Sequence, residues 1–540
     1  MNQLLSTNPL LLLFIVAAIG YLIGNIKIFG ANLGVAAVLF VGLFFGMISP
    51  NYDVPPIIFQ IGLVFFVYSV GLSSGPAFFQ SFKRNGLRDF TFILVMLTLS
   101  AVIAVLMHYL FGFSKAMTTG IYAGSSTNTS ALAAVTESVK ATSQFSKMEL
   151  QDLVVGYTYS YPMGVLGVMI VLKLMEALLK VDYQKELDIL RKDYPIEAEL
   201  TSGSVKITND DLAGVHLRDF MKDKNWNLVF GRIKQGENIS LTTWDTELQV
   251  GDLINVIGSK QDFAEAAAFM GEETDENYLY NNREYEVKRI FVSNPDVVGR
   301  ELSSLNLSEK FSAVITRIRR GDIDMLAKPD TVLEQGDRIR FVARKQDLKE
   351  LSEFFGDSYY ESSRVNLFSF GLGIALGLLL GTISLQLGTS IVFSLGYAGG
   401  PLVVGLMLGA LRRTGPIVWT LPYSANVTLR QIGLILLLAV IGLESGHGFL
   451  NSLNGTQGLL IFVAGTIVSM LTAALSILIG FKLFRIPFSI LLGFLSNQPA
   501  ILDFSTHMSG NRAPIIGYTL MFPIALIMKI LYSQILYFIL

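Results

Sequence analysis

Two polar stretches interrupt the apolar parts of this 540-residue chain. The first, Gly124–Ser130, is rich in hydroxyl and amide side chains, and the second, Ser496–Pro499, adds a proline that frees a backbone carbonyl. Lipid offers no hydrogen bonds, so polar segments persist at membrane depth only where protein buries them or where they line a cavity. We therefore expect two re-entrant hairpins whose tips meet near the membrane midplane. The alternative is tight packing of small residues between helices.

Such tips have the chemistry of an anion-binding site. Helix N-termini present N–H groups and positive dipole ends to an anionic ligand. Hydroxyl and amide side chains then fix the orientation of that ligand. The expected substrate-binding residues are Ser125, Ser126, Thr127, Asn128, Thr129, Ser130, Ser496, Asn497, Gln498 and Pro499.

Three ionisable residues are candidates for carrying charge or for coupling. Lys529 lies deep in an apolar run, where an ionisable residue is functional by default, although its long stem could also reach the membrane surface. Asp503 stands one helical turn before His507, so a proton- or cation-linked role competes with a pair that faces water at a helix end. Glu444 occupies the place of Ser73 in a related stretch, and a solvated carboxylate is the alternative there.

No set of residues predicts catalysis. The chain has four scattered histidines and no cysteine, so thiolate chemistry and Cys-based metal sites are excluded. It contains no Walker lysine motif, and its net charge of −2 gives no reason to expect a nucleic-acid partner. We expect no enzyme activity, no cofactor and no metal; a solute would move down a gradient or by exchange.

The elements that position these residues are expected to be membrane-spanning helices. The chain is 51% hydrophobic and 16% charged, with a mean hydropathy of +0.52, which excludes an ordinary soluble protein. Its apolar residues form two membrane halves, 1–180 and 365–540. A span needs about 20 apolar residues, which predicts ten spans at 4–26, 29–49, 57–79, 89–111, 152–172, 366–386, 390–411, 428–445, 456–481 and 513–535.

The two halves repeat each other. Ile61–Phe82 (IGLVFFVYSVGLSSGPAFFQSF) matches Ile432–Leu453 (IGLILLLAVIGLESGHGFLNSL). Three further matches follow in the same order: Gly42–Gly46 with Gly405–Gly409, Thr127–Ala131 with Ser496–Ala500, and Gly156–Pro162 with Gly517–Pro523. Five spans per half is an odd number, so the second half should be inverted. This predicts a polytopic α-helical membrane protein with an inverted repeat of two five-span halves, an architecture typical of secondary transporters.

Between the halves lies a charged block with a repeat of its own. Arg232–Glu237 aligns with Arg317–Asp322, and Asp245–Asp252 aligns with Asp330–Asp337, both 85 residues apart. Each copy alternates apolar and polar residues in short strands before a short helix, which predicts a central pair of α+β domains at 195–271 and 284–356. The distribution of Lys and Arg places 182–362 in the cytoplasm if the two expected re-entrant hairpins return to the side of the membrane from which they entered. If these segments crossed the membrane fully, 182–362 would lie outside.

The pattern D-T-x-L-x-x-G-D-x-I in each copy resembles the TrkA-C domain of potassium-transport regulators. In other proteins that domain can bind a small regulatory ligand, so such a ligand is one candidate partner here. The other interpretation is an assembly or spacer module. No G-x-G-x-x-G precedes either copy, so the companion nucleotide-binding domain is not expected.

The order of parts resembles the aspartate:alanine exchanger family of bacterial transporters over nearly the full chain. The stretches Phe66–Phe79 and Gly124–Ala131 resemble the corresponding segments of that family. The resemblance implies a multi-pass protein of the bacterial inner membrane, a homodimer, that exchanges small carboxylates or amino acids by alternating access in an elevator-like manner. Aspartate for alanine is one such exchange, and a dicarboxylate such as succinate is another substrate.

Two other classes remain as alternatives. One is an ion channel that the TrkA-C-like modules gate, although no T-V-G-Y-G filter occurs in the sequence. The other is a ligand-gated membrane sensor without transport. The expected partners of the exchanger are a small anionic substrate, the lipid bilayer and a second copy of the chain.

Overall fold

The computed structural model describes the chain in two compact units. The membrane unit comprises Met1–Ile196, Gly371–Leu411 and Val427–Leu540, and the α+β unit comprises Glu197–Phe370 and Arg412–Asn426. Residues outside the described part are 1, 29–30, 33, 50–51, 53, 85, 142–146, 184–185, 187–199, 223, 225, 275–283, 322, 388–390, 454–455 and 512; the side chains of Pro499 and Asp503, both candidate site residues, also lie outside it.

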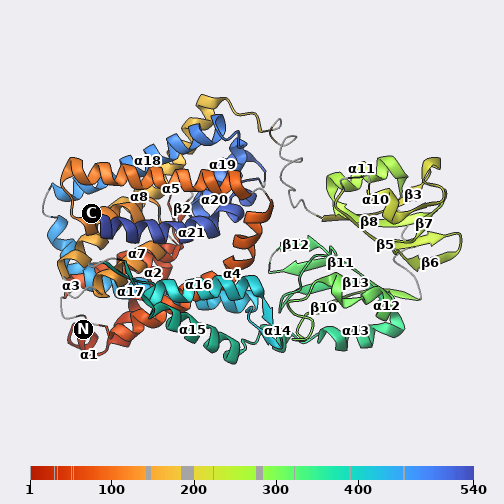
Figure 1. Ribbon diagram of the computed structural model, residues 1–540, viewed down its shortest axis with the longest axis horizontal. Coiled ribbons are helices and arrows are strands. Elements are labelled where there is room, and N and C mark those ends of the chain that lie inside the picture. Colours follow the sequence, from red (N-terminus) through yellow and green to blue (C-terminus); the bar gives the residue numbers. More distant parts are fainter. Residues whose placement is uncertain are drawn as a thin grey trace. The chain divides into compact units, whose positions relative to one another are not determined.

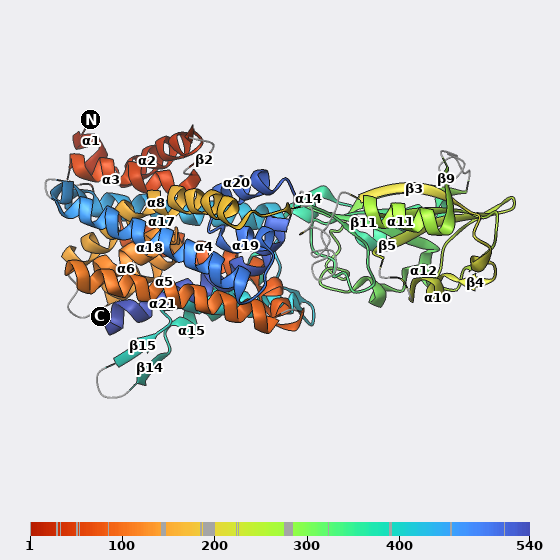
Figure 2. The ribbon, with the colours of Figure 1, turned by 90° about the horizontal axis from the view of Figure 1, so that it is seen from above.

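The membrane unit is built of helices that follow the apolar runs of the sequence (Figure 1). Its first half contains α1 (Asn2–Thr7), α2 (Pro9–Gly24), α3 (Ala37–Ile48), α4 (Pro56–Arg84), α5 (Gly86–Phe111), α6 (Lys115–Ser125), α7 (Thr129–Ala141) and α8 (Lys147–Leu179). Its second half contains α15 (Leu367–Gly381), α16 (Gly396–Leu411), α17 (Tyr423–Leu453), α18 (Gln457–Lys482), α19 (Phe488–Leu495), α20 (Pro499–Ser509) and α21 (Ala513–Ile539). A hairpin of β14 (Ser384–Leu387) and β15 (Ile391–Ser394) projects from these helices (Figure 2).

Among the described residues, six helices are long and apolar enough to cross a membrane, or seven when α21, which bends by 45° between Phe522 and Ile524, counts as one span. This is fewer than the ten predicted spans, because α2, α3 and α16 are shorter than 18 residues. Two of them start late for a local reason. Gly34, three residues before α3, and Gly396, the first residue of α16, adopt φ values of +54° and +60°, so a regular helix does not extend through them toward the N-terminus.

Glycines of the two halves pack directly against each other. A Cβ on Gly42 of α3 would stand 3.0 Å from the Cα of Gly442 on α17, and a Cβ on Gly71 of α4 would stand 3.1 Å from the carbonyl carbon of Gly405 on α16. Both contacts join one repeated motif to the other across the halves. These glycines therefore allow the helix backbones to approach closely. Small residues spaced four apart commonly serve this purpose in membrane helices.

One further contact joins two residues that the repeat makes equivalent. Gly62 on α4 and Gly433 on α17 both follow the isoleucine that opens the longest match. A Cβ on Gly62 would stand 2.9 Å from the carbonyl oxygen of Gly433. The longest sequence match therefore packs against its own copy at this position.

The described part of the α+β unit contains two larger sheets, whose inner strands such as β8 (Leu253–Ser259) are buried along most of their length, and two two-stranded sheets. The first sheet has the order β6-β5-β8-β3-β9, from β3 (Leu200–Ile207), β5 (Leu228–Gln235), β6 (Asn238–Leu241), β8 (Leu253–Ser259) and β9 (Gly271–Thr274). The second has the order β10-β13-β11-β12, from β10 (Tyr285–Phe291), β11 (Ala313–Arg320), β12 (Ile323–Leu326) and β13 (Arg338–Arg344). Helix α11 (Lys260–Met270) packs on the first sheet, and α13 (Leu348–Phe355) packs on β10 of the second.

The 85-residue repeat is visible in these sheets. Strands β5, β6 and β8 start at residues 228, 238 and 253, and β11, β12 and β13 start 85 residues later, at 313, 323 and 338. The shared Asp closes the same turn in both copies: Asp252 accepts from the N–H of Gln249 at 2.9 Å, and Asp337 accepts from the N–H of Glu334 at 2.8 Å. The repeated motif therefore has a structural role in the turn before the last strand.

The α+β unit also contains shorter elements. They are β4 (Val215–His216), α10 (Leu217–Lys222), β7 (Glu247–Leu248), α12 (Leu307–Phe311), α14 (Tyr359–Ser363), β16 (Arg413–Thr414) and β17 (Ile417–Val418). The last two form a small hairpin in the loop that joins α16 to α17.

Candidate functional site

Both polar stretches are helix breaks of the same length. Residues 126–128 separate α6 from α7, and residues 496–498 separate α19 from α20. We call them the first and the second break. Thr127 in the first break has φ +48°, which a threonine adopts only where its surroundings require it. The helix–break–helix form of both predicted hairpins is therefore present.

The helix that follows the first break is capped by the break itself. The side-chain oxygen of Asn128 accepts from the N–H of Ala131 at 3.0 Å, so Asn128 is an N-cap of α7. The hydroxyls of Ser125 and Ser126 donate back to the carbonyls of Tyr122 and Ala123. These predicted binding side chains thus have structural hydrogen bonds within their own hairpin.

The second break is arranged differently. Ser496 donates to the carbonyl of Leu492 at 2.7 Å and lies 3.2 Å from the hydroxyl of Ser505, so it too is held within its hairpin. Gln498 is the N-cap residue of α20, but its side chain makes no capping hydrogen bond. The side chain of Asn497 points elsewhere, to a lysine on another helix.

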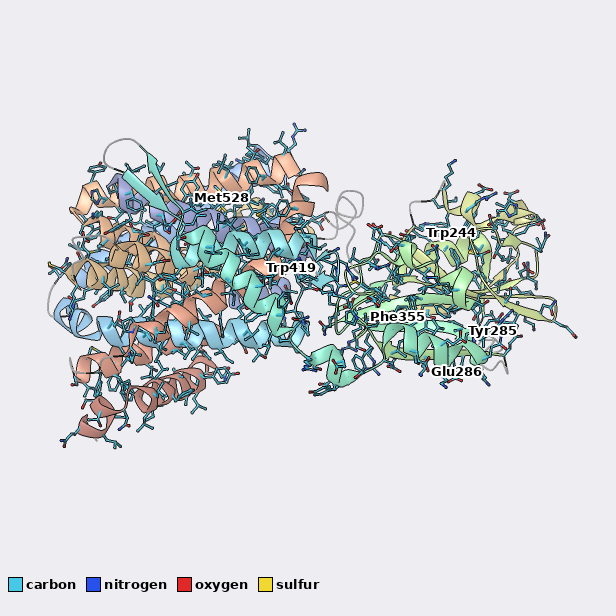
Figure 3. All side chains as sticks on the ribbon, turned by 60° about the horizontal axis from the view of Figure 1, so that its bottom comes forward. Trp244, Tyr285, Glu286, Phe355, Trp419 and Met528 are labelled. Atoms are coloured by element: carbon cyan, nitrogen blue, oxygen red, sulfur yellow. The ribbon has the colours of Figure 1, made fainter. Side chains whose placement is uncertain are left out.

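That lysine is Lys529 of α21, which follows Met528, labelled in Figure 3. Its ammonium donates to the side-chain oxygen of Asn497 at 2.5 Å and to the carbonyl oxygen of Ser126 at 3.4 Å. The residue is only 5% exposed. One buried cation therefore contacts both breaks, and the structure brings Lys529 into the predicted site.

Two tyrosines of α8 also contact both hairpins. The hydroxyl of Tyr157 lies 3.0 Å from that of Thr129, at the start of α7. Tyr161 donates to the side-chain oxygen of Gln498 at 3.0 Å, and the two tyrosine rings lie 5.4 Å apart. Sequence reasoning missed both as site residues, because their motif, Gly156–Pro162, stands out only as a repeat. Its recurrence at Gly517–Pro523 is the signal that could have found them.

A cavity of about 30 Å³ lies between the breaks. It is lined by Ser125, Ser126, Asn497 and Lys529, together with Ser100, Ser469 and Thr472 from α5 and α18 and six apolar residues, among them Val168. Space of this size holds one or two waters, whereas small-molecule pockets measure roughly 300–1,000 Å³. The cavity beside Lys529 is therefore smaller than a carboxylate ligand requires.

Three buried polar atoms around the breaks have no hydrogen-bond partner within the described part of the chain. They are the hydroxyl of Thr127, the amide nitrogen of Gln498 and the hydroxyl of Thr472. Buried polar groups are normally paired, so each such donor marks a place where a bound water or a ligand would be stabilised.

The remaining candidates lie apart from this cavity or outside the described side chains. Glu444 lies on α17 between glycines that pack against α3, and it is not among the residues that line the cavity. Ser130 is buried in the first turn of α7. Pro499 opens α20 and Asp503 follows one turn later, but their side chains are not described.

Two carboxylates bind helix N-termini at places away from the breaks. Glu186 accepts from the N–H groups of Phe488 and Ser489 at 2.6 and 2.9 Å, at the start of α19. Glu137 of α7 accepts from the N–H groups of Tyr397 and Ala398, at the start of α16. A negative charge at a helix N-terminus is stabilising. Sequence reasoning missed both, because no local pattern announces a cap supplied from a distant part of the chain.

Comparison with known proteins gives a consistent result. A family model described as "predicted permease membrane region" matches residues 12–177 and 369–538, and a TrkA-C domain model matches residues 287–356. An uncharacterized transporter of Geobacter sulfurreducens is 46% identical and covers 99% of both chains. An uncharacterized transporter of Symbiobacterium thermophilum is 39% identical with the same coverage, and a putative transport protein of Edwardsiella ictaluri is 31% identical over 97% of both chains.

A solved structure, the GsuK RCK domain, aligns with 30% of this chain and 65% of its own at 9% identity. The TM-score is 0.16, which is too low to support an argument about the fold.

Proposed function

The chain belongs to the family of transporters described by that permease membrane region, and from this premise we propose that it exchanges small carboxylates or amino acids across the membrane by alternating access. The substrates we propose are aspartate and alanine, or a dicarboxylate such as succinate. The site we propose lies between the two breaks, with Lys529 as its cation.

The observation that carries this proposal is the position of the Lys529 ammonium. It is buried, and its two acceptors, a side-chain amide and a backbone carbonyl, are both neutral. Among the side chains that the structure describes, no carboxylate lies within ion-pair distance of it. A buried charge is costly unless an opposite charge compensates it. An anionic substrate would supply that charge, which favours a carboxylate over a neutral or cationic solute.

Helix α20 offers a second feature that suits an anion. It has 11 residues, begins at the second break, and has no side-chain cap at its N-terminus. The first N–H groups of a helix have no partner within it, and they carry the positive end of the helix dipole. A carboxylate held by Lys529 at the second break would lie near this end.

The size of the cavity supports alternating access as part of this proposal. Space for one or two waters must expand before a carboxylate can enter, so the hairpins have to move relative to their surroundings. We propose that they move as a bundle against a frame of α3, α4, α16 and α17, whose glycines allow close backbone contact. The inverted repeat, the inner-membrane location, the cytoplasmic position of 182–362 and the homodimer are parts of the same proposal.

Counterflow in proteoliposomes tests this function. Vesicles that contain the purified protein are loaded with unlabelled aspartate, alanine or succinate, and uptake of each labelled compound is measured. We expect uptake that saturates and that requires a substrate inside. Uptake that is equal in substrate-loaded and empty vesicles would favour the channel alternative, and no uptake of any of the three would remove the proposed substrate class.

A further inference from the structure

A second cavity, of about 580 Å³, lies within the α+β unit and is unrelated to the breaks. Its walls come from three parts of that unit: the second sheet domain, the segment 358–367 that leads into α15, and the loop between α16 and α17. We call it the junction cavity. Its volume lies in the range of small-molecule sites, roughly 300–1,000 Å³. Both connections from the second domain to the membrane helices therefore border one ligand-sized space.

Two opposite charges face each other in this cavity without a hydrogen bond between them. The guanidinium of Arg364 lies 3.8 Å from the carboxylate of Glu361, and the two side chains are 65% and 52% exposed. The backbone of these two residues is fixed, because the side-chain amide of Gln335 donates to the carbonyl oxygens of Glu361 and Arg364, at 2.8 and 3.2 Å. A loose exposed ion pair contributes about 0–1 kcal/mol, so a ligand can separate the two charges at small cost.

Apolar residues also line the cavity. They include Pro416 and Val418 from the loop, Val365 just before α15 and Leu367 at its start. We propose that the junction cavity binds a small zwitterion, with its acid group on Arg364, its ammonium on Glu361 and its apolar part against Pro416 and Val418. Our choice of amino acids as ligands rests on the proposed exchange function. The ethanolamine headgroup of a phospholipid has the same pair of charges and is the other source of this chemistry.

Such a ligand would act on the loop that leads into α17. Arg413 in that loop donates to the carbonyl oxygens of Pro295 and Val298 at 3.0 and 2.9 Å, and both residues line the cavity. The loop is thus fastened to the second domain at the edge of the proposed site. A bound zwitterion would tie the segment before α15 to the same loop. In this proposal it regulates the membrane helices and is not transported from this site.

A charged cluster holds the turn that contains Gln335. Arg320 contacts Glu334 and Asp337 at 2.7 Å each, in the turn that also holds Gln335. Burial alone would lower the pKa of the Arg320 guanidinium, but the hydrogen bond to Asp337 and the two negative charges raise it. These contacts fix the turn, and Gln335 in it would pass a shift of segment 358–367 to the second sheet domain.

Tryptophan fluorescence of the full-length protein tests the proposal. The chain has three tryptophans, so the W226F/W244F variant leaves Trp419, which is buried beside Val418 and donates to Thr414 at 2.9 Å (Figure 3). We expect a saturable change in Trp419 emission on addition of alanine or aspartate in detergent, or on transfer into nanodiscs that contain phosphatidylethanolamine instead of phosphatidylcholine. The first result identifies a free amino acid as the ligand, and the second a lipid headgroup.

Variants locate the site. R364Q and E361Q should each weaken the apparent affinity at least tenfold, and the charge-swapped variant E361R/R364E should recover it in part. E350Q, an exposed carboxylate on α13, is the matched control and should behave as wild type. N497A removes a contact of the proposed transport site and should leave the Trp419 response intact.

The outcomes separate this proposal from the exchange function. No response to either ligand source, or a response that R364Q and E361Q leave unchanged, overturns the junction site even when counterflow is normal. A response that needs both charges in a protein that shows no counterflow keeps the junction site and removes the exchange function.

Discussion

The ammonium of Lys529 donates to the side-chain oxygen of Asn497 at 2.5 Å, whereas Asn128, which the repeat makes equivalent to Asn497, caps its own helix. The two halves therefore share a backbone arrangement but not its chemistry. Position 168, which the Gly156–Pro162 match aligns with Lys529, is a valine that lines the same cavity. All the positive charge of the proposed site thus comes from the second half.

The two asparagines should give different phenotypes. N128A removes the cap of α7, so it should lower the free energy of unfolding by about 0.5–2 kcal/mol and leave the KM for exchange close to wild type. N497A should leave thermal stability nearly unchanged and raise the KM several-fold. Thermal unfolding and counterflow on the same two preparations check this. Equal effects of the two substitutions on KM would contradict the assignment.

Tyr161 should matter through its hydroxyl. Y161F removes only the group that donates to Gln498, a hydrogen bond that contributes about 0.5–1.5 kcal/mol. We expect slower exchange, by a few-fold to about tenfold, with a folded protein. Y109F on α5 is the control, because Tyr109 is 74% exposed. If both variants exchange at the wild-type rate, the link between α8 and the second break has no functional role.

Sequence patterns predicted the two breaks. Lipid cannot form hydrogen bonds with polar side chains, so a run of small polar residues within an apolar stretch indicates an interruption that protein buries. These patterns did not predict the roles of the individual side chains. Asn128 and Asn497 look alike in the sequence, and only the position of α21 gives one of them an ammonium partner. Tyr157 and Tyr161 were missed as site residues because tyrosines in an apolar helix are more often core residues.

Sequence patterns also predicted the membrane spans only in part. Length and composition located every long helix, but hydropathy does not register a glycine with positive φ. Gly34 lies three residues before α3 and Gly396 is the first residue of α16, so both helices start later than their predicted segments. The 85-residue repeat was easier to follow, because each strand keeps its position relative to the turn that Asp252 or Asp337 closes.

Glu186 should hold α19 and, through it, the second break. Its carboxylate accepts from two N–H groups and from the hydroxyl of Ser489 at 2.7 Å. E186Q removes the charge that faces the helix N-terminus, an interaction of about 0.3–1 kcal/mol when exposed and more when partly buried. We expect faster amide hydrogen exchange in 488–495 and slower transport, with E186D intermediate. Unchanged protection of 488–495 in E186Q would show that the cap does not stabilise α19.

The glycine contacts between the halves should be intolerant of a methyl group. A Cβ on Gly442 would stand 2.9 Å from the Cα of Gly42, so G442A should lower stability by about 1–3 kcal/mol. Gly371 on α15 has open space at its Cβ position, so G371A is the control and should be neutral or stabilising. The apparent melting temperature of each purified variant is the measurement. A melting temperature for G442A at or above that of G371A would mean that this contact is not tight.

The central claim is that the Lys529 ammonium binds the carboxylate of the substrate. K529M keeps the apolar stem and removes the charge, so the protein should fold at least as well as wild type, because a buried unpaired cation is costly. A hydrogen bond to a charged group contributes about 1.5–3 kcal/mol, which corresponds to roughly a 10- to 150-fold loss in kcat/KM.

The direct measurement is the concentration dependence of labelled dicarboxylate counterflow by K529M, K529R and wild type at matched protein content, with thermal unfolding as the test of folding. We predict that K529M loses about 10- to 150-fold in kcat/KM and that K529R retains part of the activity. Counterflow by a folded K529M protein with the wild-type KM and rate would contradict the account.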